Sequence, residues 1–421
     1  MPLSARSRPG TVNRWNSLVD GAAAEPRRRL VAMSTAGLDE AGRELLRGSI
    51  RRMLDRIAPL ENVARWDRDD HIPRDYIRHL ADLGLCMAAV PTQFGGTGSD
   101  PRVIALAIEE LSSRSPALAS LLIQNAIYGS MNLLATCSAE QQARLLPDLD
   151  AGRLLFAYGL SEPNVGSDLA SVETRTERRR RSVVVNGTKR WCSDADICDF
   201  IVTLVRTGPV EARRANLSIL LIPSTSDGIT IRAMATMGMR GIKTCEVTFD
   251  DVVAPVENVL GGPACWDRGW QQLIGPALDA EKIQVPAMAI GIARSALDEA
   301  WTYAQTRRQF GVPICAHQSI RHALVDAKMK LLACRAMLDR ALSAISENRD
   351  SAVETSMAKL FVAETACEIV LACQRILGAY GYAEGFQMER LVRDVLVLPI
   401  WGGSSAIQRN NLAGLLGLPR A

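Results

Sequence analysis

Apolar side chains recur three and four positions apart over the first and the last third of the chain. This spacing predicts amphipathic helices that pack on one another. The helix that begins at Ser138 also carries a start signal, since a serine hydroxyl can cap the first turn and Glu140 and Gln141 follow in it. The predicted helices cover residues 38–57, 76–85, 104–111, 138–146, 270–303, 320–345 and 351–377.

Between Leu154 and Ala264 the pattern changes to short apolar runs, which are typical of strands. Turns are expected at Asn186-Gly187 and at Ser226-Asp227-Gly228. The order of elements predicts a mainly α fold with a central β domain. The predicted strands cover residues 154–160, 182–185, 200–205, 217–222, 228–233 and 244–249.

Composition narrows the class of protein. The 421 residues carry a net charge of only +3, so nothing global indicates a nucleic-acid partner. The longest apolar runs are too short to span a membrane. Ten scattered cysteines and four histidines indicate neither zinc nor a disulfide framework, and Cys86, Cys334 and Cys373 fall in apolar helical patterns as core residues. We expect no metal and a reducing, cytoplasmic location.

The N-terminal stretch shows no hydrophobic period. Residues 1–33 are rich in Arg, Pro, Ser and Ala and lack an apolar segment of signal-peptide length. We expect a disordered or non-native extension, with Met33 as an alternative start. A mitochondrial transit sequence, which would place the protein in the matrix, is the other interpretation of the arginines.

Two segments of the β region suit a flavin. The strand that ends at Leu160 leads into Ser161-Glu162-Pro163-Asn164-Val165-Gly166-Ser167-Asp168, where Pro163 and Gly166 leave backbone N–H groups free. Later, Trp191 is followed at two residues by Ser193, which gives a flat apolar surface with a hydroxyl at its rim.

These segments resemble the acyl-CoA dehydrogenase family, whose flavin strands read Thr-Glu-Pro-x-x-Gly-Ser-Asp and Trp-Ile-Thr. Here Ser161 stands for the first Thr, and Cys192-Ser193 for Ile-Thr, so both hydroxyls are kept. The resemblance runs from about Leu38 to Leu418 and implies FAD. It also implies an N-terminal helical domain (34–153), a small β-barrel-like domain (154–265) and a C-terminal four-helix bundle (266–421).

Two later segments extend the resemblance. Arg307-Arg308-Gln309-Phe310-Gly311 is similar to the family's Arg-x-Gln-Phe-Gly, in which the Arg reaches across a subunit contact to the FAD pyrophosphate. A guanidinium suits a diphosphate because it can make two charge-assisted bonds at once. Residues 374–382 resemble the turn Gln-x-x-Gly-Gly-x-Gly-Tyr, with Ala379 replacing its second Gly. At least a dimer, and by resemblance a homotetramer, is implied. The cofactor residues so implied are Tyr158, Leu160, Ser161, Gly166, Ser167, Trp191, Ser193, Arg307, Phe310, Gln318, Gln374, Gly378 and Ser404.

The chain departs from the family at the catalytic base. Most members place a Glu in Tyr-Glu-Gly-Thr before the last helix, but this chain reads Trp401-Gly402-Gly403-Ser404 there. A minority, which includes isovaleryl-CoA dehydrogenase, carries the base in Leu-Asp-x-Glu-Arg on the helix after the β domain. Leu278-Asp279-Ala280-Glu281-Lys282 matches that sequence, so the resemblance assigns the base to Glu281.

The implied reaction is α,β-dehydrogenation of an acyl thioester. Glu281 would take the α proton while hydride leaves the β carbon for flavin N5, and the Gly402 N–H and a flavin ribityl hydroxyl would hold the carbonyl oxygen. Trp401, Gly402 and Gly403 would line the substrate pocket, where the two glycines leave room for a branched or cyclic acyl group.

Several alternatives stay open. The thioester could be carried by coenzyme A or by an acyl or peptidyl carrier protein, and the acceptor could be an electron-transfer flavoprotein or oxygen. The run 178–181 of four arginines is either a solvated turn or a contact for the phosphates of coenzyme A or for an acidic carrier protein. A protein of the same fold could instead be a thioester lyase, a flavin-dependent oxygenase or a catalytically silent thioester-binding subunit.

Overall fold

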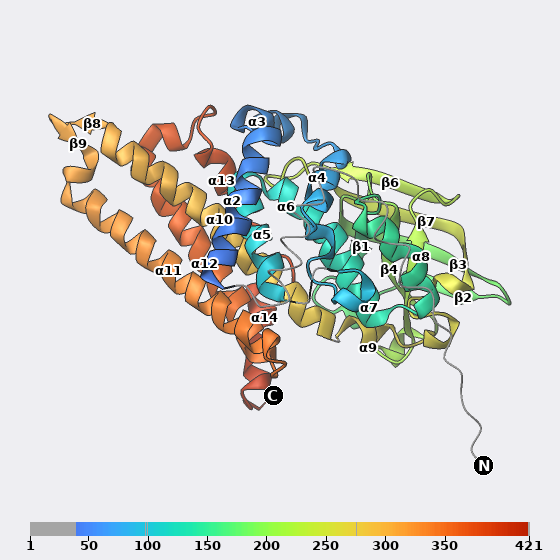
Figure 1. Cartoon of the computed structure of the whole chain (residues 1–421). Coiled ribbons are helices and arrows are strands. Elements are labelled where there is room, and N and C mark those ends of the chain that lie inside the picture. Colours follow the sequence, from blue (N-terminus) through green and yellow to red (C-terminus); the bar gives the residue numbers. More distant parts are fainter. Residues whose placement is uncertain (1–38, 97, 99, 275, 420–421) are drawn as a thin grey trace, which may run out of the picture.

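The computed structural model describes residues 39–96, 98, 100–274 and 276–419 (Figure 1). The side chains of residues 133 and 276–281 also lie outside what it describes. The expectations for residues 1–33, including the start at Met33, therefore fall outside the described residues.

The first part of the chain is helical, as its apolar period predicts. In α2 (Glu40–Ile57) the Asp39 carboxylate accepts a hydrogen bond from the Gly42 N–H at 2.7 Å, and one stripe of the helix is buried. The expected start at Ser138 is confirmed as a capping box with Gln141. The other elements are α3 (Leu60–Asp69), η1 (Arg74–Tyr76), α4 (Ile77–Asp82), η2 (Leu85–Met87), η3 (Thr92–Phe94), α5 (Pro101–Arg114), α6 (Pro116–Leu122), η4 (Ile123–Met131), α7 (Asn132–Thr136) and α8 (Ala139–Asp150).

A curled seven-stranded sheet follows. Its order is β1-β4-β2-β3-β7-β6, and β5 pairs with β4 in addition. β1 and β2 both run parallel to β4, whereas the other strand pairs are antiparallel. The strands are β1 (Phe156–Gly159), β2 (Arg175–Arg178), β3 (Ser182–Ser193), β4 (Phe200–Arg206), β5 (Leu217–Pro223), β6 (Ile229–Met234) and β7 (Thr244–Pro255).

The sheet corrects one expectation from the sequence. Asn186-Gly187 is not a turn, because β3 continues through it to Ser193 and pairs with β7 on both sides. Opposite Asn186 the partner strand β7 has one extra residue, which forms a bulge at Asp250-Asp251, and Asn186 exchanges hydrogen bonds with Asp251. The turn at Ser226-Asp227-Gly228 is present between β5 and β6. β2, a short strand of charged residues and Thr176, was not predicted.

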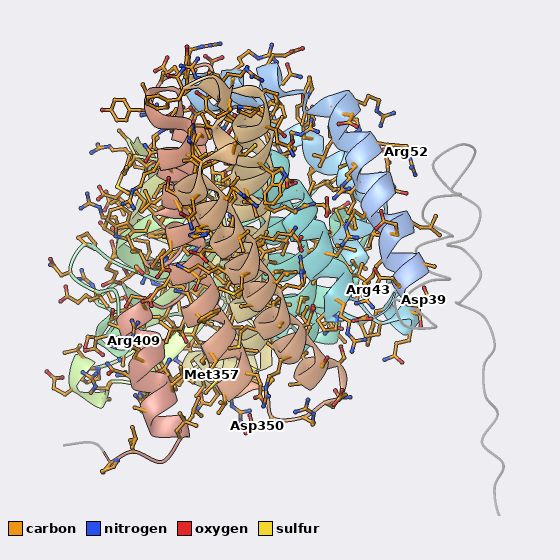
Figure 2. The ribbon with its side chains drawn as sticks, turned by 90° about the vertical axis from the view of Figure 1, so that its left-hand side faces the viewer. Asp39, Arg43, Arg52, Asp350, Met357 and Arg409 are labelled. Carbon is orange, nitrogen blue, oxygen red and sulfur yellow. The ribbon has the colours of Figure 1, made fainter. Side chains whose placement is uncertain are left out.

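Helices return after the sheet and form a bundle in which α10, α11 and α12 pack side by side (Figures 1 and 2). Arg409, labelled in Figure 2, pairs with Glu364 and fastens α14 to α12. The elements are η7 (Val256–Asn258), η8 (Pro263–Cys265), α9 (Gly269–Leu273), α10 (Pro276–Thr306), β8 (Arg308–Gln309), β9 (Val312–Pro313), η9 (Ile314–Ala316), α11 (Gln318–Ser346), α12 (Ala352–Leu377), η10 (Gly378–Gly381), α13 (Met388–Val395) and α14 (Ser405–Leu415).

One apolar core runs from the N-terminal helices through the sheet into the bundle. Cys86, Cys334 and Cys373 are buried in it, as predicted. Arg393 of α13 binds Asp67 at 2.7 Å and joins the bundle to α3. None of the helices in the described ranges is both long and apolar enough to cross a membrane. The mainly α fold with a central β domain is confirmed.

Candidate active site

The exposed indole of Trp191 is the most unusual feature of the β domain. β3 itself carries a bulge at Arg190-Trp191, between Lys189 and Cys192, and Trp191 has φ of +66° there. A tryptophan rarely adopts this left-handed conformation, so the fold holds it against a local energy cost. The side chain is nonetheless 60% exposed. A flat aromatic surface held open in this way fits the face of a ring system.

The same bulge contacts the loop after β1, which carries the other segment of the predicted flavin site. The Arg190 N–H donates to the Ser161 carbonyl at 2.9 Å, so Ser161, in the loop that follows β1, lies beside the β3 bulge that carries Trp191. Ser193 ends β3, and its carbonyl accepts a hydrogen bond from Gln124 of η4. Tyr158, Leu160, Ser161 and Ser193 are each partly exposed. The fold therefore brings Ser161 next to the bulge that carries Trp191, with Ser193 two residues further along β3.

A buried ion pair supports the Ser161 loop from below. The fully buried Lys189 ammonium donates to Glu162 at 2.8 Å and to the Leu160 carbonyl at 3.1 Å. Glu162 also accepts from the N–H groups of Glu173 and Thr174. Burial by itself raises the pKa of Glu162, but Lys189 and these donors lower it below its ordinary value. Lys189 is shifted downward by burial, to a pKa of about 8. The pair stays ionised at neutral pH.

A second buried carboxyl lies next to Ser193. Asp194 is 1% exposed, and its Oδ2 accepts from Ser120 and Gln124 at 3.1 and 3.3 Å. Burial raises its pKa to about 7, although the Ser120 hydrogen bond opposes the shift. Unlike Glu162, this carboxyl therefore carries a proton for much of the time near neutral pH.

The third turn of α10, which carries Gln284 and Val285, connects this region to the C-terminal loop. A Cβ atom placed on Gly402 would come within 3.3 Å of Val285, so the loop lies against that turn. One residue earlier, Gln284 donates to the Tyr128 hydroxyl at 3.1 Å. Tyr128 in turn stacks on Tyr158 of β1, with ring centroids 4.1 Å apart. A continuous chain of contacts thus runs from Gly402 through α10 to the predicted flavin strand.

Position 281 lies one helical turn before these residues. At 3.6 residues per turn, it falls on the same face of α10 as Gln284 and Val285 and between them. The side chain of Glu281 lies outside what the structure describes. Its backbone position is nevertheless fixed beside the turn that contacts both Gly402 and Tyr128.

The loop 401–404 has a strained and anchored backbone. Gly402 and Gly403 have φ of +61° and +79°, and both are exposed. Gln408 donates to their two carbonyls, and the Ser404 hydroxyl accepts from Ile407 as the cap of α14. Trp401 is half-buried, and its indole N–H finds no acceptor within the described ranges. Within those ranges no residue accepts a hydrogen bond from the Gly402 N–H either.

The remaining predicted cofactor residues lie at the opposite end of the molecule. β8 and β9 form a hairpin that projects from the bundle, far from the large sheet (Figure 1). At its tip Phe310 is 93% exposed, with Gly311 beside it at positive φ. Arg307 lies over the Tyr380 ring at 5.7 Å, which brings the hairpin close to η10. Gln318 starts α11 nearby, and Gln374 and Gly378 end α12.

The fold does not bring these residues to Trp191 within one chain. Gly378 has φ of +61° and ψ of −133°, a conformation open essentially to glycine alone. No described atom lies within 4 Å of where its Cβ would be. The hairpin end therefore presents a largely exposed aromatic ring, a guanidinium that lies over Tyr380 and an open backbone at Gly378.

Two further predictions concern the surface of the β domain. Gly166 and Ser167 are exposed, and Asp168 beside them pairs with Arg213 at 2.6 Å. In the arginine run, Arg178 stacks over Trp266 and donates to the Pro263 carbonyl. The next three arginines are exposed at the β2–β3 turn.

Sequence reasoning missed Gln124, Tyr128 and Gln284. The first two lie on η4, a π-helical segment, and π-helical turns often occur at functional sites. Such a segment has no distinctive apolar period. Gln284 could have been found from its spacing of three from Glu281.

A cavity of about 470 Å³ lies elsewhere, between α2, α5, α10 and α13, and contains none of the predicted residues. Its charges are largely paired within the fold, as Arg114 is with Asp55 and Arg51 with Glu110. We regard it as structural.

Known protein families match this chain in three consecutive regions, which correspond to the N-terminal helices, the sheet and the C-terminal bundle. The family models for the N-terminal, middle and C-terminal domains of acyl-CoA dehydrogenases match residues 40–153, 157–252 and 267–416. Probable acyl-CoA dehydrogenase YngJ of Bacillus subtilis is 32% identical over 354 residues, which are 84% of this chain and 92% of the relative. Cyclohexane-1-carbonyl-CoA dehydrogenase of Geobacter metallireducens is 32% identical over 357 residues, with the same coverage.

Two further similarities bear on partners and fold. The caffeyl-CoA reductase–Etf complex subunit CarC of Acetobacterium woodii is 28% identical over 89% of this chain and 97% of its own length. Butyryl-CoA dehydrogenase from Megasphaera elsdenii superimposes with a TM-score of 0.84 at 27% identity, over 90% of this chain and 99% of that structure. Members of this family bind FAD, and the exposed indole with its flanking hydroxyls fits that cofactor. The chain therefore belongs to the acyl-CoA dehydrogenase family, whose enzymes are oxidoreductases acting on CH–CH groups.

Proposed function

We propose that the protein desaturates an acyl thioester between its α and β carbons, with Glu281 as the base. The observation that carries this proposal is the contact chain from Gly402 through Val285 and Gln284 to Tyr128 and Tyr158. It supports a reaction site between the C-terminal loop and the flavin strand. Position 281 is the acidic position of α10 nearest to that site.

FAD would be held by residues of two kinds. Trp191 would cover the ring face, and Ser161 and Ser193 would hydrogen-bond the ring edge, because these groups lie exposed around one bulge. When bound, FAD supplies the acceptor for the hydride. Arg307, Phe310, Gln318, Gln374 and Gly378 would bind the diphosphate and adenosine side of a cofactor in another copy of the chain, since they lie far from Trp191 in their own (Figure 1).

The residues of this chain would act on the substrate in three ways. The Gly402 N–H would donate to the thioester carbonyl, where negative charge develops as the α proton leaves. The Glu281 carboxylate would receive that proton. Trp401 would cover the pocket and limit the access of water. A glycine at 402 removes the carboxylate that most relatives carry there but keeps the backbone donor.

The acyl group proposed here is branched or cyclic. Gly402 presents no side chain beside Val285, which would leave width next to the α carbon. A relative with 32% identity is named for a cyclohexane ring attached to the thioester. Coenzyme A is the proposed carrier, and a carrier protein is the alternative that the exposed arginines of the β2–β3 turn would serve.

An electron-transfer flavoprotein is the proposed acceptor. One relative is named as a subunit of a complex with such a protein. Oxygen is the alternative, and the two are separated by measuring reoxidation in air with and without the flavoprotein.

The proposed reaction is tested by Glu281→Gln. Anaerobic addition of branched and cyclic acyl-CoA thioesters should bleach the flavin absorbance of the wild type. In the variant we expect bleaching to slow by about a hundred- to ten-thousand-fold, the usual contribution of a general base. FAD content should not change, since the residue does not belong to the proposed cofactor contacts.

Asp298→Asn is the matched control, because Asp298 is an exposed acid on the same helix. It should bleach like the wild type. Bleaching of Glu281→Gln at the wild-type rate would remove Glu281 as the base. A wild type that no thioester reduces would favour a lyase or a silent binding subunit.

A further inference from the structure

The side-chain amide of Gln284 forms a hydrogen bond through its nitrogen but not through its oxygen. Its Nε2 donates to the Tyr128 hydroxyl at 3.1 Å. Its Oε1 is buried and accepts from no group within the described ranges, although the residue as a whole is only 6% exposed. Buried acceptors are nearly always paired in native proteins, because an unpaired one loses its hydrogen bonds to water without replacement. This oxygen therefore calls for a donor from outside the described fold.

The rest of the fold keeps that oxygen free. Tyr128 holds the nitrogen end of the amide, and it is itself packed face to face on Tyr158 at 4.1 Å. With Nε2 engaged, the free edge of Gln284 is an acceptor. A glutamine so fixed can select for a ligand group that donates.

The place of Gln284 in the fold identifies the ligand. The residue stands between Tyr128 and the Val285–Gly402 contact, three positions after Glu281 on the same face of α10. A thioester whose carbonyl oxygen meets the Gly402 N–H, and whose α carbon meets the base, would lay its acyl group along this turn.

We propose that Gln284 Oε1 is a specificity determinant for an acyl group that carries a hydrogen-bond donor, a hydroxyl or an N–H, beyond its β carbon. This inference rests on the proposed function and names the substrate class. An acyl group with a methyl in that place fits the same volume but leaves the oxygen unpaired. Sites built to hydrogen-bond a substrate group reject the analogue without it far more strongly than apolar pockets reject an added group.

The experiment uses pairs of CoA thioesters that differ only by a hydroxyl or a methyl on the same carbon. Suitable pairs are 4-hydroxybutanoyl with pentanoyl, 5-hydroxypentanoyl with hexanoyl, and 3-hydroxy- with 3-methylcyclohexane-1-carbonyl. Two quantities are measured for each pair on the FAD-loaded oligomer. These are kcat/KM for flavin reduction and, by calorimetry, the dissociation constant of the 2-enoyl product, which is not turned over.

In the wild type we expect at least one hydroxyl compound to exceed its methyl partner by about ten- to a hundredfold in both quantities. Gln284→Met keeps the length of the side chain without the acceptor and should bring the ratio to one or below. Tyr128→Phe frees the amide and should give an intermediate ratio. Gln272→Met is the matched control, because Gln272 on α9 also has a buried, unpaired Oε1 but lies outside the site. It should keep the wild-type ratio.

Ratios of one or less for every pair in the wild type, or a preference that survives in Gln284→Met, would overturn the inference. The two proposals fail separately. If no thioester reduces the wild-type flavin, the desaturase proposal is lost, and the affinities for the enoyl compounds still decide whether Gln284 selects a donor.

Discussion

The two groups of predicted cofactor residues differ in how the chain supports them. Around Trp191 each group is held by its own chain, through a strand bulge, a fully buried ion pair and a buried carboxyl. At the hairpin end Phe310 lies on a two-residue turn, and the other predicted residues lie at nearby helix ends, where most of them are exposed. The first region is part of the folded core, whereas the second is a surface that we expect another copy of the chain to cover.

The difference implies a simple rule for substitutions. Changes at the flavin-ring end should act on the folding of the single chain, because they disturb buried charges. Changes at the hairpin end should act on assembly and cofactor retention and leave the stability of the chain almost unchanged. The three predictions below follow the expected size of the change in unfolding free energy, from the largest to the smallest.

Lys189→Met should cause the largest loss. It leaves the Glu162 carboxylate, whose side chain is 5% exposed, without its cation in the interior. Breaking a buried pair in this way costs about 3–5 kcal/mol. We expect a clearly lower midpoint in urea unfolding and a low FAD content in the purified protein.

The double variant Lys189→Met, Glu162→Gln is the control. Removing both charges should restore most of the lost stability, since the penalty comes from the unpaired carboxylate. A single variant with the wild-type midpoint would mean that the ion pair does not support the Ser161 loop.

Asp194 should give a pH-dependent effect of intermediate size. Its pKa is about 7 in the folded chain and about 4 in an unfolded one. The folded state therefore binds more proton between these values, so the unfolding free energy falls as pH rises from about 4 to 7 and then levels off. Asp194→Asn cannot lose a proton and lacks this contribution.

The unfolding free energy of the variant minus that of the wild type should therefore rise by about 2–3 kcal/mol from pH 5 to pH 8. Urea unfolding of both proteins at each pH measures this difference. Asp250→Asn is the control, because Asp250 is an exposed aspartate of β7 that does not contribute to the Asp194 shift, and it should show no such gain. Parallel pH profiles for Asp194→Asn and the wild type would contradict the burial argument.

Phe310→Ser should have the smallest effect on stability, within about 0.5 kcal/mol, because the ring is 93% exposed. We expect it to shift the mass measured by light scattering toward smaller species and to lower the ratio of flavin to protein absorbance. Leu45→Ser, at another exposed apolar position (61% exposed) on α2, should change neither. An intact oligomer with full FAD in the Phe310 variant would show that the hairpin surface is not a contact between copies.

The sequence was most informative where one side chain decides the local structure. The Ser138 cap, the buried helix stripes and the order of helices and strands were all predicted from period and capping residues. Trp191 and Ser161 were found from a motif, since each depends on its neighbours along the chain.

The parts that were missed depend on contacts between distant segments. Asn186-Gly187 has the composition of a turn, but it pairs with β7 on both sides and stays inside β3, opposite a bulge of β7. Tyr128 and Gln284 are separated by more than 150 residues, and their hydrogen bond follows from the packing of η4 on α10. The buried Lys189 could not be told from a surface lysine by its place in the sequence, because Glu162 lies on another segment.

Helix α10 begins beside the proposed reaction site and ends at the base of the β8–β9 hairpin, 31 residues later and roughly 46 Å away. A continuous helix of this length, Pro286 included, links the angle as well as the distance between its two ends. Inserting a single residue would turn the hairpin by about 100° and advance it by about 1.5 Å relative to Glu281. We therefore expect insertions and deletions among natural sequences of this enzyme to occur in surface loops and not within α10.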